Sequence, residues 1–244
     1  MNKSEHTTTR DIINFWINNN SDCGIINKMK TDHPAVFAYH YTALIYYMAS
    51  LFKTKELNYP RTITFSGNGS KYIDNFITSD KDILTELTSL IISKVYGKDK
   101  IGDIQLILPD YRKECTCYGG LYHQNNTETP KQVLYMGDGT KNEYENVKDL
   151  KEAFNGCLRE NIESEIDKLH QIYEIVLRYL IKQEEISIPV ERMMKVVTSE
   201  VKDSLKTRFQ TEIVNKYTND EGFNDTLFFL PVVQSLFNLT KEYK

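Results

Sequence analysis

Apolar residues recur at three- and four-residue steps in several long stretches of the chain, which is the spacing of one face of an α-helix. The first stretch, residues 36–52, has so few polar interruptions that we expect a helix buried on more than one side. A second stretch, 83–95, begins after Ser79 or Asp80, either of which is a good helix cap, and it ends at Gly97. These patterns predict two well-defined helices in the first half of the chain.

Two short runs rich in β-branched and apolar residues flank the second helix. The run RTITF (61–65) precedes it and predicts a short buried strand, while IQLILPD (104–110) follows it and predicts a second strand. A further helix is expected over 112–123. Because alternating strands and helices are typical of parallel strands joined by crossovers, the first part of the chain predicts an α/β fold with an open sheet. Ligands of such sheets bind at the carboxyl ends of the strands.

Beyond residue 126 the pattern becomes mainly helical. After one short strand and turn (131–140), a helical pattern runs from Glu145 to Ile181, and Pro189 opens another helix whose apolar stripe extends to Tyr217. We therefore predict two parts, an α/β domain over 1–126 and a mainly α-helical extension over 127–244.

Composition and charge exclude several classes of protein. Hydrophobic residues make up 40% of the 244 residues, which excludes a wholly disordered chain. The net charge of −4 offers no concentrated positive field, so we expect no nucleic acid partner. No apolar run approaches the roughly 20 residues that a membrane-spanning helix needs, and the polar start has no signal-peptide core, so we expect a cytoplasmic protein outside the membrane.

The cysteines and histidines do not predict a metal site. Cys115 and Cys117 are separated by one residue, which is too few for a zinc knuckle, and the five histidines are scattered. His40 lies in the first apolar helix and is interpreted as a hydrogen-bonded core histidine. The acidic pair Glu184 and Glu185 is interpreted as the solvated end of a helix. No catalytic or metal-binding residue is predicted.

The stretch SGNGS (66–70) is the strongest candidate for a functional site. It fails as a dinucleotide fingerprint, because Tyr72 stands where the third glycine is needed, and it lacks the spacing of a phosphate-binding P-loop. Glycines there permit positive φ and close approach of another molecule. Either a ligand lies on this loop or the loop is only tightly packed.

The run ITFSGNGSK (63–71) resembles the adenosine motif of the actin, Hsp70 and sugar-kinase ATPase superfamily, in which a strand enters a Thr/Ser-Gly-Gly-Gly-Ser/Ala loop. Asn68 replaces the middle glycine, and asparagine tolerates left-handed backbone angles well. The following run IQLILPDYRKECTCYGGLYH (104–123) is similar to the next strand and helix of Hsp70-like proteins. The resemblance covers about residues 35 to 125 and implies a partial ribonuclease H-like sheet.

The resemblance also implies which residues contact the nucleotide. They are Gly67, Asn68, Gly69, Ser70 and Lys71. The superfamily binds phosphates and Mg²⁺ through Asp-x-Gly-Thr and Asp-x-Gly-Gly hairpins upstream of this motif, and nothing before Arg61 matches them. Asp138-Gly139-Thr140 comes in the wrong order and is interpreted as a polar turn. We therefore expect no ATP hydrolysis by this chain alone, and ATP or ADP with Mg²⁺ only in a longer parent protein that contains it as a carboxyl-terminal part.

Two kinds of partner follow from this interpretation. One is the missing amino-terminal lobe or another protein, with self-association through apolar surface that the lobe would cover. The alternative is a scaffold that binds no nucleotide and whose helices after Glu145 contact a protein partner. Met193 and Met194 would then line a groove, although such a stripe is more often ordinary core.

Overall fold

The computed structural model describes residues 34–67, 70, 71, 73–110, 159–207 and 232. The predicted helix 112–123, the predicted strand and turn over 131–140 and the proposed boundary at residue 126 lie outside these residues. The elements, in chain order, are α3 (Pro34–Thr54), β1 (Thr62–Thr64), the π-helical turn η2 (Ile73–Ile77), α4 (Lys81–Tyr96), β2 (Gln105–Ile107), α7 (Arg159–Lys182) and α8 (Val190–Thr207).

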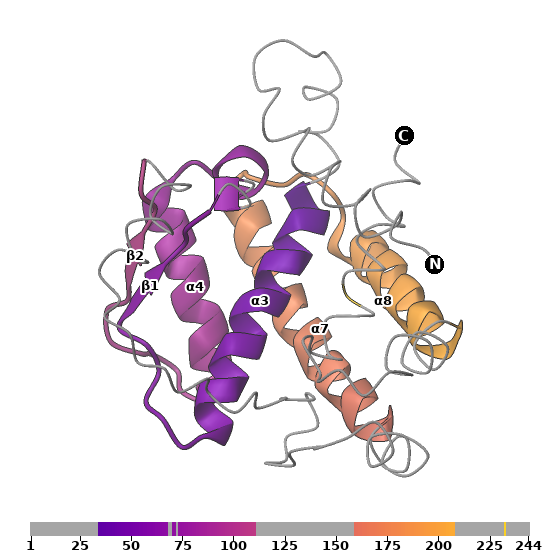
Figure 1. The fold of residues 1–244 in the computed structure, drawn as a ribbon. Coiled ribbons are helices and arrows are strands. Elements are labelled where there is room, and N and C mark those ends of the chain that lie inside the picture. The colour runs from indigo at the N-terminus through magenta and orange to yellow at the C-terminus, as the bar shows by residue number, and fades with distance from the viewer. Residues whose placement is uncertain (1–33, 68–69, 72, 111–158, 208–231, 233–244) are drawn as a thin grey trace, which may run out of the picture.

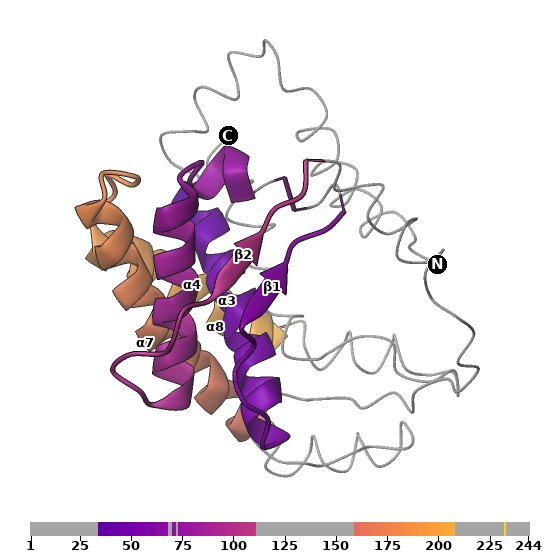
Figure 2. The ribbon, with the colours of Figure 1, turned by 90° about the vertical axis from the view of Figure 1, so that its left-hand side faces the viewer.

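The helices pack side by side, with the strands on one flank. α3 contacts both α4 and α7, α7 also contacts α4 and α8, and β2 contacts α4 (Figure 1). A quarter turn of the molecule shows β1 and β2 running along the outer side of α4 and α3 (Figure 2). The buried residues of all these elements form one hydrophobic core. Helices assigned by the sequence to the α/β part and to the helical extension therefore share a core.

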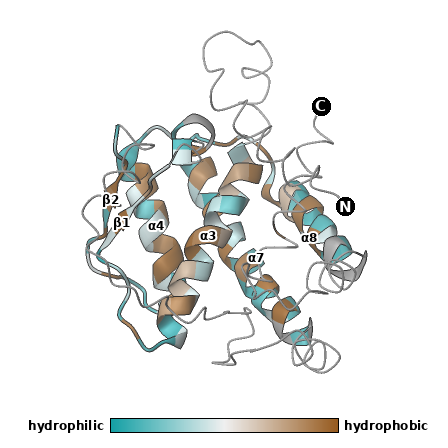
Figure 3. Ribbon diagram, viewed as in Figure 1, coloured by the Kyte–Doolittle hydropathy of each residue, from teal (hydrophilic) through white to brown (hydrophobic). Residues whose placement is uncertain are grey.

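Helix α3 is the central element, and the prediction that it is buried on more than one side is confirmed. Tyr41, Thr42 and Ala43 are consecutive and all are buried, which a helix with a single buried face does not allow. Alanines at 35, 38, 43 and 49 have small side chains and are buried as well. By contrast, α7 and α8 carry hydrophilic and hydrophobic residues in alternation along their length (Figure 3).

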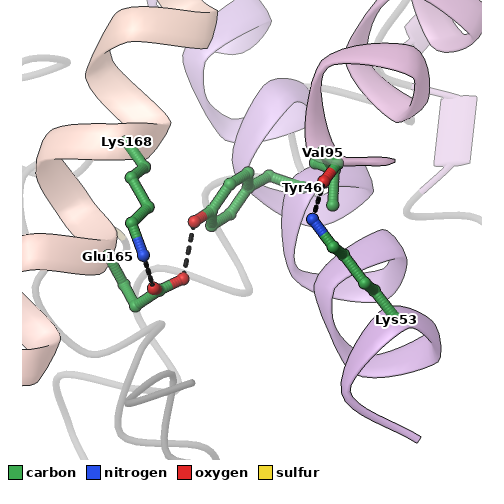
Figure 4. Close-up of polar contacts among 5 residues, drawn as sticks. All are labelled: Tyr46, Lys53, Val95, Glu165 and Lys168. Atoms are coloured by element: carbon green, nitrogen blue, oxygen red, sulfur yellow. Dashed lines mark hydrogen bonds and ion pairs between the residues drawn. The ribbon is translucent and has the colours of Figure 1, made fainter. Parts of the chain in front are cut away.

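Polar side chains also join the central helices. The Tyr46 hydroxyl of α3 donates to Glu165 Oε2 of α7 at 2.6 Å, and Lys168 Nζ pairs with Glu165 Oε1 at 2.5 Å (Figure 4). Lys53 Nζ, in the last turn of α3, donates to the carbonyl oxygen of Val95 at 2.6 Å, near the end of α4. Glu165 is buried, and these donors offset the cost of removing its charge from water.

Helix α4 begins and ends as its sequence predicts. Asp80, rather than Ser79, is the N-cap, and its Oδ1 accepts from the backbone N–H groups of Asp82 and Ile83 at 2.8 and 3.2 Å. Gly97 follows the last turn with φ 65°, in the left-handed conformation that favours glycine.

The strands are parallel, as predicted, with Ile63 of β1 opposite Leu106 of β2. The described part of the chain is thus mostly helical with a small parallel sheet of the α/β kind. The strand predicted within 61–65 is confirmed over Thr62–Thr64, but its expected burial is wrong for Thr62 and Thr64, which are exposed, while Ile63 is buried. Among the described residues, helices pack against one face of this pair, so alternate side chains point to solvent.

The carboxyl-terminal helices follow their predicted spacing. The structure gives α7 over Arg159–Lys182, and α8 begins at Val190, directly after Pro189. Part of the apolar stripe of α8 is buried within this chain. Its buried members are Val190, Met193, Val197 and Val201. The core interpretation therefore holds for Met193, and Met194 is half-buried. In the part of the chain that the structure describes, no helix combines the length and apolarity needed to cross a membrane.

Candidate functional site

The loop after β1 lies at one end of the molecule, where β1 ends, α4 begins and α7 ends (Figure 1). Parallel pairing of β1 and β2 puts the carboxyl ends of both strands on this side. The sequence predicted a ligand site at such an edge. The described residues of the loop are Ser66, Gly67, Ser70 and Lys71, and the predicted site residues Asn68 and Gly69 lie outside the described part.

Gly67 has a backbone conformation that requires glycine. Its φ is 81°, where an L-residue is strained by about 1 to 2 kcal/mol. Apart from the glycine itself and its two chain neighbours, no atom of the described residues lies within 4 Å of the position that a Cβ on Gly67 would take. Tight packing is therefore not the reason for this glycine in the described structure. The positive φ of the turn favours glycine, and among the described residues other than its chain neighbours none fills the Cβ position of Gly67.

Ser70 is buried, and its hydrogen bonds to Gly67 close the turn. It is 8% exposed, its Oγ donates to the Gly67 carbonyl oxygen at 2.8 Å, and its backbone N–H reaches the same oxygen at 3.1 Å. The hydroxyl thus stabilises the loop's own conformation. Lys71 follows in a half-buried position and is the charged side chain of the described loop residues.

The π-helical turn η2 joins the loop to α4, and the sequence analysis missed it. Ile73 and Ile77 are buried, η2 packs against α3, and the N–H of Thr78 donates to the Ile73 carbonyl at 3.2 Å. Isoleucines four residues apart also suit an α-helical turn, so the local pattern carries no signal for the wider turn. Single π turns are rare and occur often at functional sites.

Thr78 ties this segment to two other elements. Its Oγ1 accepts from the backbone N–H of Asp80 at 3.0 Å, next to the start of α4. The same hydroxyl donates to Oε1 of Glu185, after the end of α7, at 2.9 Å. The interpretation of Glu184 and Glu185 as solvated is therefore wrong for Glu185, which is half-buried and hydrogen-bonded, whereas Glu184 is exposed. Contact between residues 107 positions apart has no local sequence signal.

Two carboxylates, those of Glu86 and Asp80, act on Tyr179 beside α4. The Tyr179 hydroxyl of α7 donates to Glu86 Oε2 at 2.7 Å. Burial, the Glu86 carboxylate and, more weakly, Asp80 raise the pKa of Tyr179 well above its usual range, so this phenol remains a donor. Negative charge here disfavours a phosphate close to Asp80 and Glu86. A nucleoside, which is uncharged, does not meet that repulsion.

Histidines and metal ligands do not form a second site in the described residues. Burial lowers the pKa of both His40 and His170 to about 4, so both rings are neutral near pH 7. His170 Nε2 lies 3.1 Å from the Tyr39 hydroxyl, a buried pair that joins α7 to α3. Within the described ranges, no three His, Cys, Asp or Glu side chains are grouped so as to bind a metal ion.

Comparison with known proteins gives no match: no family model, no curated protein and no solved structure is similar to this chain. The resemblance to the adenosine motif therefore depends on residues 63–71 and on the spacing of the elements that follow. The geometry at Gly67 is the observation on which a functional proposal has to be built.

Proposed function

We propose that this chain supplies the adenosine-side binding loop of an actin- or Hsp70-like ATPase, and that β1 and β2 belong to a ribonuclease H-like sheet. Support comes from the order of elements: a strand, a glycine turn, a helical segment, and a second strand parallel to the first. In sheets of parallel strands the turn after a strand's carboxyl end is where ligands bind.

The observation that carries the proposal is the backbone at Gly67. Gly67 has φ 81°, and apart from its chain neighbours no described atom lies within 4 Å of the position of its missing side chain, which leaves space beside its Cα. Such a backbone admits a planar base or a ribose at van der Waals distance, which any side chain there would prevent. Ser70 stabilises that shape through the Gly67 carbonyl.

The phosphates and Mg²⁺ belong to another part of the cleft in this proposal. Phosphoryl transfer needs a metal ion and donors around the transferred group. The described loop contributes Lys71 alone as a cation, and the nearby carboxylates of Asp80 and Glu86 oppose a phosphate. The chain by itself then binds the nucleoside portion without hydrolysis, and ATP or ADP with Mg²⁺ is bound together with a partner lobe.

Calorimetric titration with adenosine, and separately with ATP and Mg²⁺, tests this function. We expect saturable binding of both ligands with affinities within about tenfold, because the nucleoside portion provides most of the contact. Replacing Lys71 by methionine should weaken ATP binding and leave adenosine binding unchanged. The scaffold alternative gives no saturable heat with either ligand, and that result would remove the proposed function.

Gly67→Ala and Gly97→Ala form a matched pair for the same titration. Both glycines have positive φ (81° and 65°), and neither has a described atom within 4 Å of a Cβ position. The two variants should therefore lose similar stability in urea, by about 1 kcal/mol. Gly67→Ala should bind adenosine at least about tenfold more weakly, since the new methyl occupies the approach path and strains the turn. Equal affinity in the two variants would contradict a role of Gly67 in ligand contact.

A further inference from the structure

The turn between α7 and α8 contacts the segment that follows the candidate loop through the side chain of Glu185. The chain leaves α7 at Glu184, whose φ is 60°, and the N–H of Glu185 donates back to the Leu180 carbonyl at 3.0 Å. This backbone arrangement fixes where the Glu185 side chain begins. Its carboxylate accepts the Thr78 hydroxyl at 2.9 Å.

Thr78 stands at the junction of the elements that hold the loop. Its N–H closes the π turn on Ile73, and its hydroxyl connects the N–H of Asp80 with the carboxylate of Glu185. Residue 78 is also 5% exposed, so water does not readily replace a lost partner.

A π turn needs such support because its hydrogen bond spans one more residue than that of an α-helix and its geometry is poorer. On one side, η2 is held by the burial of Ile73 and Ile77 and its contact with α3. At its far end the described support is Thr78. Ser70 stands three residues before the first residue of η2, so we expect a shift of η2 to displace this closing residue of the glycine turn.

We propose that Glu185 is a positioning residue for the glycine turn: through Thr78 it fixes η2 and thereby the conformation of Gly67 and Ser70. As far as ligand affinity is concerned, this inference rests on the proposed nucleoside binding. It assigns a regulatory role to the α7–α8 turn, because a partner that displaces this turn releases Thr78 and weakens ligand binding. By linkage, a bound ligand opposes that displacement to the same extent.

Four variants test the inference. Glu185→Ala and Thr78→Val remove the two partners, and Thr78→Ser restores the hydroxyl. Tyr179→Phe is the control, because it removes a hydrogen bond from α7 to Glu86 of α4 without touching Thr78. We measure urea stability, hydrogen exchange in peptides spanning 66–77, and adenosine affinity.

Glu185→Ala and Thr78→Val should each raise amide exchange in peptides 66–77 and weaken adenosine binding by about tenfold, whereas the double variant should add little to either effect. Thr78→Ser should restore both to wild-type values. Tyr179→Phe should lose similar stability without changing either quantity.

Exchange in 66–77 that rises equally in Tyr179→Phe, or that stays unchanged in Glu185→Ala, would overturn the positioning role. Wild-type protein that fails to bind adenosine would instead remove the proposed function. The exchange measurement on the same four variants would still decide whether Glu185 positions the turn.

Discussion

Replacing Glu184 by glycine should stabilise the protein, and replacing Gly97 by alanine should destabilise it. Both residues hold the same place in the hydrogen-bond pattern that ends a helix, Gly97 directly after α4 and Glu184 two residues after the last residue of α7. Glu184 has φ 60° and Gly97 has φ 65°. In each case the N–H of this residue donates three residues back, to Ile181 and to Lys94. This is the Schellman arrangement, in which the left-handed position strongly favours glycine.

The magnitude follows from three contributions. A left-handed L-residue costs about 1 to 2 kcal/mol, and Glu184→Gly removes that cost. Glycine has more conformational freedom in the unfolded chain, which lowers the free energy of unfolding by about 0.4 to 1 kcal/mol. Removing a carboxylate from the negative end of α7 adds about 0.3 to 1 kcal/mol. We expect a net gain of about 1 kcal/mol, and for Gly97→Ala, which involves no charge, a loss somewhat under 1 kcal/mol.

Urea unfolding followed by circular dichroism measures both changes, and a gain of 1 kcal/mol should raise the melting temperature by about 2 to 4 °C in a chain of this size. Glu184→Gln is the control, since it removes the charge and keeps the Cβ. It should gain no more than the electrostatic part, about 0.3 to 1 kcal/mol. The argument from backbone strain would be refuted if Glu184→Gly were no more stable than Glu184→Gln.

Two further predictions concern buried polar contacts of α7, one at His170 and one at Glu165. Burial, opposed by Asp167 and reinforced by Lys202, lowers the pKa of His170 from 6.5 to about 4, so the unfolded chain takes up a proton first as pH falls. The contribution of neutral His170 to the free energy of unfolding is complete above pH 6.5 and is lost toward pH 4, by about 3 kcal/mol. His170→Gln should therefore flatten the plot of urea midpoint against pH over that range. Tyr46→Phe removes a buried donor to a carboxylate and should cost about 1.5 to 3 kcal/mol, whereas Lys168→Met, at a side chain 57% exposed, should cost less than about 1 kcal/mol. An unchanged pH profile in His170→Gln would contradict the role given to His170. Equal losses of stability in Tyr46→Phe and Lys168→Met would contradict the larger contribution given to Tyr46.

The elements that sequence predicted correctly are those whose signals are local. Asp80 binds N–H groups two and three residues away, so its cap is visible in a short window. Gly97 marks the end of α4 by a backbone preference that belongs to glycine itself. The parallel pairing of β1 and β2 followed from the strand, helix, strand order, which restricts how the chain can return.

Other features depend on contacts between residues far apart in the chain, and no local sequence pattern predicts them. Glu184 takes the left-handed position of a cap although it is not a glycine, because the packing of α7 fixes where that helix ends. Glu185 looks like a solvent-exposed acid until Thr78 is brought beside it. Likewise, the exposure of Thr62 and Thr64 follows from which face of the strand pair the helices cover.

Sequence and structure each answer part of the question of why residue 67 is a glycine. From the sequence, Gly67 was compatible with tight packing or with ligand approach, because both need a missing side chain. The described structure removes packing as the explanation, since the Cβ position is open, and it assigns the glycine to a φ of 81°. Ser70, which the resemblance expects to contact the nucleotide, directs its hydroxyl to the carbonyl of Gly67. The ligand contact that we propose at this turn therefore depends on the backbone and on the space beside Gly67, which suit the planar base of a nucleoside.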